Sequence, residues 1–160
     1  MKSRLLIFTL FLAVICIGSA GNAMAQSVTG TGVFNPSAGG APLTVTVSSN
    51  GGSGGVLRIG QGQTQVVGQP VDQCVQSDSV FGNAAFVVAR ITQASGDLAG
   101  AEGQFLILGF VDNGKDGDFV LVPFFGTFIS TEQIPACDLF TFPFSIPLPV
   151  ERGGFQGKSS

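Results

Sequence analysis

Apolar and polar residues alternate along much of this chain with a period of two. In segment 43–49, Leu43, Val45 and Val47 fall on one side, and threonines and a serine fall on the other. Segment 83–92 behaves in the same way, because Val87, Ala89 and Ile91 oppose Phe86, Val88 and Arg90. Side chains of a β-strand point alternately to its two faces, so this period predicts half-buried strands.

The rest of the chain divides into further short strands separated by glycine, asparagine, aspartate and serine. We expect them at 29–34, 56–59, 63–67, 103–111, 118–124 and 140–146, whereas the polar segment 69–79 is expected to pair only in part. The apolar segments 103–111 and 118–124 should lie centrally and form a hairpin through 112–117. Pro143 restricts the last of these strands to an edge or a bulge. The pattern predicts an all-β fold, a single antiparallel β-barrel or β-sandwich of about eight or nine short strands.

The beginning of the chain has a different pattern. Lys2 and Arg4 precede an almost unbroken apolar run from residue 5 to 17, and Ala23-Met24-Ala25 supplies small residues on both sides of Met24. A basic start, a short apolar core and a small-x-small site are the parts of a secretory signal peptide. We therefore expect residues 1–25 to form a cleaved signal helix, residues 26–156 the all-β domain, and 157–160 a disordered tail.

Two alternatives to this cleavage site follow from the same segment. Gly18-Ser19-Ala20 would also fit a peptidase, which leaves the mature start open by a few residues. A lipoprotein signal with Cys16 as the lipidated residue fails, because Ile15 is too large for the position before the cysteine. No later run approaches the ~20 apolar residues of a membrane span. The expected location is secreted and extracellular, or periplasmic, in a bacterium, with no membrane insertion after cleavage.

Composition narrows the chemistry of the mature domain. Removing Lys2 and Arg4 from seven basic residues leaves five against ten acidic ones, a net charge of −5. Such a domain lacks the basic surface that nucleic acids and anionic membranes require. The chain contains no His, Trp or Tyr, which removes the usual general base, the Ser-His-Asp and Cys-His pairs and imidazole ligands. We expect no enzyme activity and no cofactor.

Once the signal peptide is removed, Cys74 and Cys137 are the two remaining cysteines. In an oxidising compartment two cysteines most simply form one disulfide. Two unpaired buried thiols remain the alternative at this point.

Asp112, Asp116 and Asp118 lie within seven residues, with glycines between them. Closely spaced carboxylates on a turned backbone are typical of Ca²⁺ loops. The spacing departs from an EF-hand, since the third position is Gly114 and the twelfth is Pro123. Aspartate and glycine are also what a tight hairpin requires, so we expect no metal here and keep the three aspartates as weak candidates.

The remaining candidates concern cleft carboxylates and the phenylalanines. Asp97 with Glu102, and Glu132 with Asp138, are acidic pairs, but a glycosidase would also need aromatic side chains that stack on sugars. Arg90 is expected to be a solvent-facing residue near the end of its strand. Phe140, Phe142 and Phe144 share one face; if the sheet closes, they could line a pocket for a small apolar ligand, although filling the core is the commoner role.

Four short motifs occur in order along the chain. They are Thr29-Gly30-Thr31-Gly32, Gly82-Asn83-Ala84-Ala85-Phe86, Val111-Asp112-Asn113-Gly114-Lys115-Asp116-Gly117-Asp118-Phe119 and Gly153-Gly154-Phe155-Gln156. In this order they resemble the motifs of small secreted bacterial β-domains of the post-COAP type. The departures are the Phe- and Pro-rich stretch 140–149 and the absence of Tyr and His. That family has no established activity, so the resemblance implies fold and export and transfers no catalytic residue.

Together these observations predict a secreted, non-enzymatic β-module with a structural or binding role at or outside the cell surface. Two other functions fit the same residues. The first is a carrier of a small hydrophobic ligand inside a barrel, and the second is a Ca²⁺-dependent adhesion module that uses the 112–118 turn.

Overall fold

A computed structural model describes residues 26–36, 40–51, 54–78, 82–123, 128–129, 136–137 and 145–158. The expected signal peptide, Phe140, Phe142, Phe144, Glu132 and Asp138 lie outside these residues. Strands account for nearly all of the regular structure, with two single-turn 3-10 helices in connections. The strands are β1 (Ser27–Phe34), β2 (Leu43–Asn50), β3 (Gly54–Gln61), β4 (Thr64–Asp78), β5 (Gly82–Ser95), β6 (Phe105–Asp112), β7 (Phe119–Pro123), β8 (Phe128–Ile129) and β9 (Ser145–Lys158), and the 3-10 helices are η2 (Gly96–Leu98) and η3 (Gly114–Asp116).

Eight of the strands close into one antiparallel barrel. Their order around it is β5-β4-β3-β2-β1-β9-β7-β6, and β6 pairs back with β5, from Asn83 with Asp112 to Arg90 with Phe105. The two-residue strand β8 pairs with Phe105 and Leu106 of β6, on the same side as β7, which reaches only Gly109 to Val111. The predicted all-β class is confirmed, and of the two architectures expected from the sequence the chain adopts the barrel.

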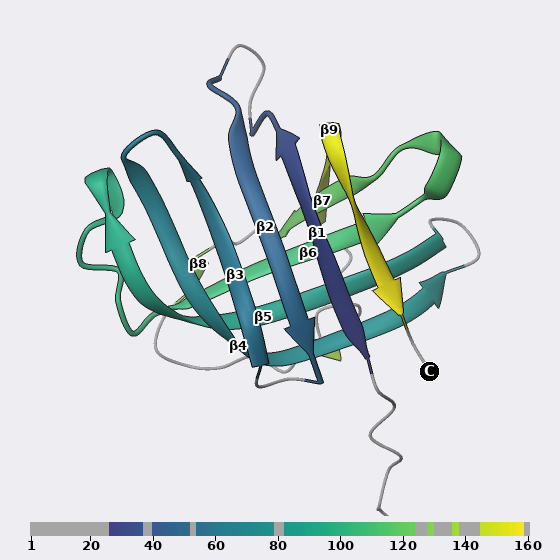
Figure 1. Ribbon diagram of the computed structural model, residues 1–160, viewed down its shortest axis with the longest axis horizontal. Coiled ribbons are helices and arrows are strands. Elements are labelled where there is room, and N and C mark those ends of the chain that lie inside the picture. The colour runs from purple at the N-terminus through teal and green to yellow at the C-terminus, as the bar shows by residue number, and fades with distance from the viewer. Residues whose placement is uncertain are drawn as a thin grey trace, which may run out of the picture.

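Long strands carry the chain from one wall of the barrel to the other. In Figure 1, β1, β2, β3 and β9 form the near wall, and β5 and β6 cross behind them at a steep angle. The pairing of β4 with β5 shifts register between Val67 and Gly68 and again between Pro70 and Asp72. Such irregularities bend and twist a strand locally, which allows β4 and β5 to belong to both walls.

The inner faces of the strands fill the barrel with one apolar cluster. Because β5 alternates, Ala85, Val87, Ala89 and Ile91 enter this cluster, as the sequence predicts. Replacing any large side chain of this cluster by a smaller one would destabilise the fold, since protein interiors pack without spare volume. Its largest fully buried members are Phe34, Phe110, Leu57, Leu106 and Leu108.

Phe155 of β9 lies inside the barrel across two glycines of β1. A Cβ built on Gly30 or Gly32 would lie within 2.8 Å of the Phe155 ring. The ring also packs on Phe110, with centroids 4.7 Å apart and an interplanar angle of 52°. Glycine exposes backbone and contributes no packing, so an aromatic ring laid over a glycine pair restores the missing contacts.

A second apolar cluster lies outside the barrel wall. Phe86, Val88 and Ile107 point outward from β5 and β6 and are buried there with Cys74 and Ala136. Segment 103–111 was expected to be apolar on both faces and central, and the two clusters on either side of β6 confirm this. A disulfide between Cys74 and Cys137 links Ala136 of this outer cluster to β4. Its S–S distance is 2.00 Å, and the two Cα atoms are 5.0 Å apart. The predicted pairing is therefore present.

Three details of the strands differ from the sequence expectation. The polar segment 69–79 was expected to pair only in part, yet β4 pairs with β5 as far as Asp78. The domain was expected to end at 156, with 157–160 disordered. Gly157 and Lys158 instead pair with Val28 and Ser27, because β9 runs alongside the whole of β1.

The third detail concerns the final strand, which was expected at 140–146 and instead is β9, beginning at Ser145. Pro147 and Pro149 lie in its first half, opposite Leu121 and Phe119 of β7. The Val150 amide donates to the carbonyl of Asp118, the residue that precedes β7. Successive backbone amides of a strand point to opposite sides, so the nitrogens of both prolines face away from β7. On that side β9 pairs with β1 only from Val150 onward, so the missing N–H groups of the prolines cost no ladder hydrogen bond. The rule that places a strand proline at an edge or a bulge, applied above to Pro143, therefore holds for Pro147 and Pro149, which lie at an edge of β9.

Candidate functional site

The outer face of the near wall carries a row of polar side chains on β2. Val45 and Val47 are buried in the barrel core, with exposures of 0% and 2%. Their neighbours Thr44 and Thr46 must then point outward. Thr46 also accepts a hydrogen bond from the Thr31 hydroxyl of β1, at 3.2 Å. The threonine hydroxyls on this wall therefore lie at fixed positions on a sheet whose opposite face is buried.

Strand β3 adds a cation and a glycine to the same face. Leu57 and Ile59 are buried in the core, which turns Arg58 and Gly60 outward. The register places Arg58 between Thr46 of β2 and Val67 of β4. Neighbouring strands lie about 4.8 Å apart, so Arg58 and Thr46 are direct neighbours on the outer face.

The neighbouring row is centred on Gly60, which pairs with Thr44 on one side and Gln65 on the other. With no side chain at the centre, Thr44 and Gln65 leave a depression between them. A Cβ at this position would lie 2.6 Å from the Thr64 carbonyl oxygen and 2.8 Å from the Gln65 Cα. Glycine is thus required by the close approach of β4, and it forms the floor of a groove.

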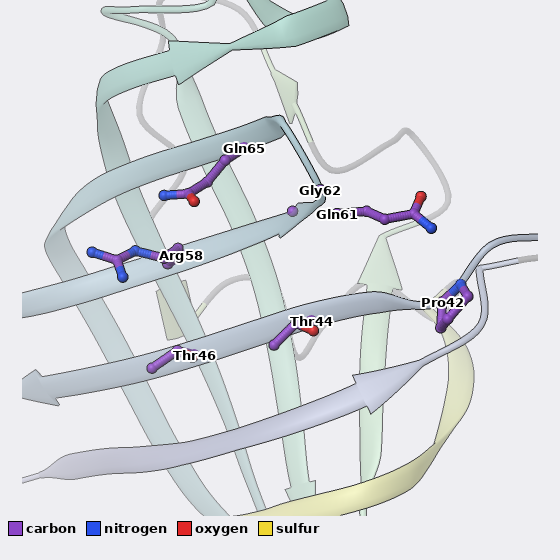
Figure 2. Close-up of a pocket in the computed structure, with 8 residues that line it drawn as sticks. Pro42, Thr44, Thr46, Arg58, Gln61, Gly62 and Gln65 are labelled. Atoms are coloured by element: carbon purple, nitrogen blue, oxygen red, sulfur yellow. The ribbon is translucent and has the colours of Figure 1, made fainter.

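This groove has a volume of about 370 Å³ and runs over the outer face of β2, β3 and the start of β4 (Figure 2). Arg58 and Gln65 extend in the same direction over the sheet, and Gln61 points the other way from the hairpin. The volume lies at the lower end of the ~300–1,000 Å³ typical of small-molecule sites. The lining residues are Pro42, Thr44, Thr46, Arg58, Gly60, Gln61, Gly62 and Gln65.

The hairpin that forms one end of the groove is anchored to the barrel. Gly62 has a φ of 57°, the left-handed conformation that a two-residue hairpin with glycine at its first position requires. The Ser95 hydroxyl of β5 donates to the Gln63 carbonyl at 2.8 Å. The Asp97 amide donates to the Thr64 hydroxyl at 3.4 Å. These bonds fix the end of the groove relative to its floor.

Among the described residues that line the groove, Arg58 is the only charged one. Its side chain is exposed. Within the part of the chain that the structure describes, the guanidinium group has no hydrogen-bond or ion-pair partner. A guanidinium group presents five donors in a planar fork that matches carboxylate geometry. The groove therefore combines one available cation with hydroxyl and amide groups that both donate and accept hydrogen bonds.

The aspartate-rich turn predicted from the sequence binds backbone amides. The Asp118 carboxylate accepts from the Asn113 amide at 3.2 Å and from the Phe155 amide at 2.6 Å. Asp112 accepts from the Gly114 amide at 3.2 Å. Asp116 is exposed. Among the described residues no three acidic or cysteine side chains come together as a metal site would require. In this arrangement Asp118 joins the β6–β7 connection to β9.

The other charged candidates lie at the surface. Glu102 accepts a hydrogen bond from the Ala94 amide at 3.1 Å, and Asp97 belongs to the single turn η2. Both residues therefore help to shape the β5–β6 connection. Arg90 is exposed on β5, as expected for a solvent-facing residue.

Inside the barrel, the described residues form one apolar cluster. Seventeen buried residues of the barrel pack against one another in a single cluster that includes Phe34, Phe110 and Phe155. The three phenylalanines proposed for a ligand pocket, Phe140, Phe142 and Phe144, lie outside the described residues. The described interior is therefore occupied by side chains, and the pocket hypothesis stays a prediction.

The groove itself was not foreseen from the sequence. Alternation in segment 43–49 predicted the outward face of β2, and Arg58 is a single charge within the apolar run 56–59. What brings Thr46, Arg58 and Gln65 together is the register of three strands. That register depends on where the hairpin turns fall. The expected strands at 56–59 and 63–67 left a turn at 60–62, whereas the actual loop lies at 62–63.

No family model, curated protein or solved structure matches this chain. The resemblance to post-COAP-type domains therefore stays a prediction that rests on its four motifs. Within the described residues, no helix has the length and apolar character needed to cross a membrane.

Proposed function

We propose that this chain is an exported, non-enzymatic binding module that takes a saccharide in the groove on the outer face of β2, β3 and β4. In this proposal residues 1–25 direct export and are removed, and the oxidising destination forms the Cys74–Cys137 disulfide. The observation that carries the proposal is the unpaired Arg58 among threonine and glutamine side chains around the Gly60 depression. A closed barrel supports such a site because its wall is rigid on the inner side.

The chemistry of the groove favours a hydroxyl-rich ligand over a peptide. Both β2 and β3 are paired along both edges, β2 with β1 and β3, and β3 with β2 and β4. An extended peptide therefore finds no free backbone to pair with. Pro42 is the only side chain of the lining without a polar group, so the groove offers little to apolar peptide side chains. Hydroxyl and amide side chains match the alternating donors and acceptors of a sugar.

The absence of histidine supports a binding role rather than catalysis. The described residues that line the groove include no carboxylate, cysteine or histidine. General acid–base and nucleophilic catalysis depend mainly on those groups. Arg58 can hold and polarise a ligand, but a guanidinium group does not give up its proton in proteins.

The test uses the exported protein with its disulfide intact and two probes, a hyaluronan tetrasaccharide and the same tetrasaccharide with its carboxyl groups reduced. Calorimetry should detect binding of at least one probe by the wild type. Thr44→Trp fills the groove and should abolish that binding. The matched control Thr29→Trp changes an exposed threonine on β1 of the same wall and should leave it unchanged. If neither probe binds, or if both variants bind as the wild type does, the proposal is wrong.

Export is tested separately by the intact mass of the protein recovered outside the cytoplasm. We expect a chain that begins at Gln26 and is lighter by two hydrogens than the reduced form. A full-length chain, or one that carries a lipid on Cys16, would contradict the export part of the proposal.

A further inference from the structure

We infer that the saccharide recognised in this groove places a single carboxylate on Arg58, which binds it through its guanidinium fork. This inference rests on the proposed function and adds the chemical class of the ligand. Uronic acids are sugars that carry this group.

Arg58 has a neutral environment on its own wall. The two residues paired with it across the sheet are Thr46 and Val67, and the nearest row carries Thr44, Gly60 and Gln65. None of these carries a charge that could neutralise the guanidinium group. An arginine held beside hydroxyls and amides, with five donors free, is suited to two parallel hydrogen bonds with a planar carboxylate.

The neighbouring side chains complete a site for the sugar that carries the carboxylate. Thr46 stands directly beside Arg58, and Gln65 lies across the Gly60 depression from Thr44. With the carboxylate on the guanidinium group, the ring would lie over Gly60, where no side chain obstructs it. The ring hydroxyls would then face the Thr44 hydroxyl and the Gln65 amide.

The overall charge argues for one carboxylate rather than a dense polyanion. The mature domain carries five basic and ten acidic residues, so it repels strongly negative ligands at long range. A single arginine matches a single negative charge, whereas phosphate or sulfate clusters are usually bound by several cations. In a saccharide in which uronate alternates with neutral sugars, the density of negative charge is low and one carboxylate at a time can meet Arg58.

The experiment measures affinity for the hyaluronan tetrasaccharide and for its carboxyl-reduced form, with wild type, Arg58→Gln and Arg58→Lys. Reduction replaces each carboxylate by a neutral hydroxymethyl group and leaves the remaining hydroxyls in place. For the wild type we expect the acidic form to bind about tenfold more tightly, since charge-assisted, bidentate hydrogen bonds are the strong ones. Arg58→Gln should bind both forms equally, at the lower affinity, and Arg58→Lys should keep part of the preference.

Arg152→Gln is the matched control, because Arg152 is an exposed arginine on β9 of the same wall and does not line the groove. It should leave both affinities unchanged. Equal binding of the two forms by the wild type, or a preference that survives Arg58→Gln, overturns the carboxylate inference and leaves the proposed binding function standing. Failure of both forms to bind overturns the inference together with the proposed function.

Discussion

The glycine-rich strand β1 depends on one aromatic ring, and Phe155→Ala tests this dependence. Phe155 is 3% exposed and contacts Phe110. Truncating a buried phenylalanine to alanine costs about 3–5 kcal/mol, through lost transfer energy and the cavity that remains. With a denaturant slope of about 2 kcal/mol/M, a loss of about 4 kcal/mol lowers the midpoint of urea unfolding by about 2 M.

Gln156→Ala is the control for this measurement, since Gln156 is exposed and adjacent in β9. A surface change of this kind should alter the free energy of unfolding by no more than about 0.5 kcal/mol. If Phe155→Ala destabilises the domain no more than Gln156→Ala does, the ring does not support the barrel as described.

A double-mutant cycle with Gly32→Ala makes the test specific to the ring and the glycine. A Cβ on Gly32 would lie 2.8 Å from the Phe155 Cζ atom and 3.0 Å from the Val150 Cγ1 atom. We expect Gly32→Ala to destabilise the wild type by about 1–3 kcal/mol, as overpacking does. In the Phe155→Ala background most of this cost should disappear, so that the coupling energy exceeds about 0.5 kcal/mol. Strictly additive effects would refute the proposed contact.

Four further outcomes are expected. Replacing Cys74 and Cys137 together by alanine releases a link between residues 63 apart and should lower the free energy of unfolding by about 4 kcal/mol, measured by urea unfolding of oxidised protein; an unchanged midpoint would contradict this. Asp118→Ala removes the acceptor for two backbone amides and should cost about 2 kcal/mol. The wild-type melting temperature should be the same in millimolar Ca²⁺ and in chelator, whereas a calcium-dependent rise would support the adhesion alternative. Arg58→Gln should change stability by less than about 0.5 kcal/mol in thermal unfolding, because its side chain is exposed.

Local pattern was enough to predict the inward and outward faces of individual strands. Alternation assigned Val45 and Val47 to one face of β2, and the same rule separated Val87 from Val88 in β5. The hairpin at 112–117 could also be predicted, because turn residues act on the adjacent backbone. The disulfide could be predicted because Cys74 and Cys137 are the two cysteines outside the expected signal peptide. Each of these features depends on residue types at known spacings.

Features that depend on distant strands could not be predicted in this way. Segment 69–79 looked too polar to pair fully, yet tertiary contacts compensate for its polarity. The Gln73 side-chain amide donates to the Gln26 carbonyl, and the Val75 amide donates to the Gln26 side chain. Asp72 accepts from the Ala136 amide at 2.7 Å. Partners so far away in the sequence cannot be recognised from local composition.

The groove was missed for a related reason. Its side chains come from three strands, and Arg58 meets Thr46 and Val67 only through the registers of β2 with β3 and β3 with β4. A shift of one residue in either register would turn the partner side chains to the opposite face. The groove is therefore a property of strand pairing, which the sequence pattern left open.

The most direct test of the proposed binding site is an amide chemical-shift titration of the ¹⁵N-labelled, disulfide-bonded domain with the hyaluronan tetrasaccharide. We expect the largest shifts at Thr44, Thr46, Arg58, Gly60 and Gln65, with little change in the 112–118 turn. Shifts concentrated in that turn or among the core residues, or no shifts at millimolar ligand, would contradict the claim that this domain binds saccharides on the outer face of β2, β3 and β4.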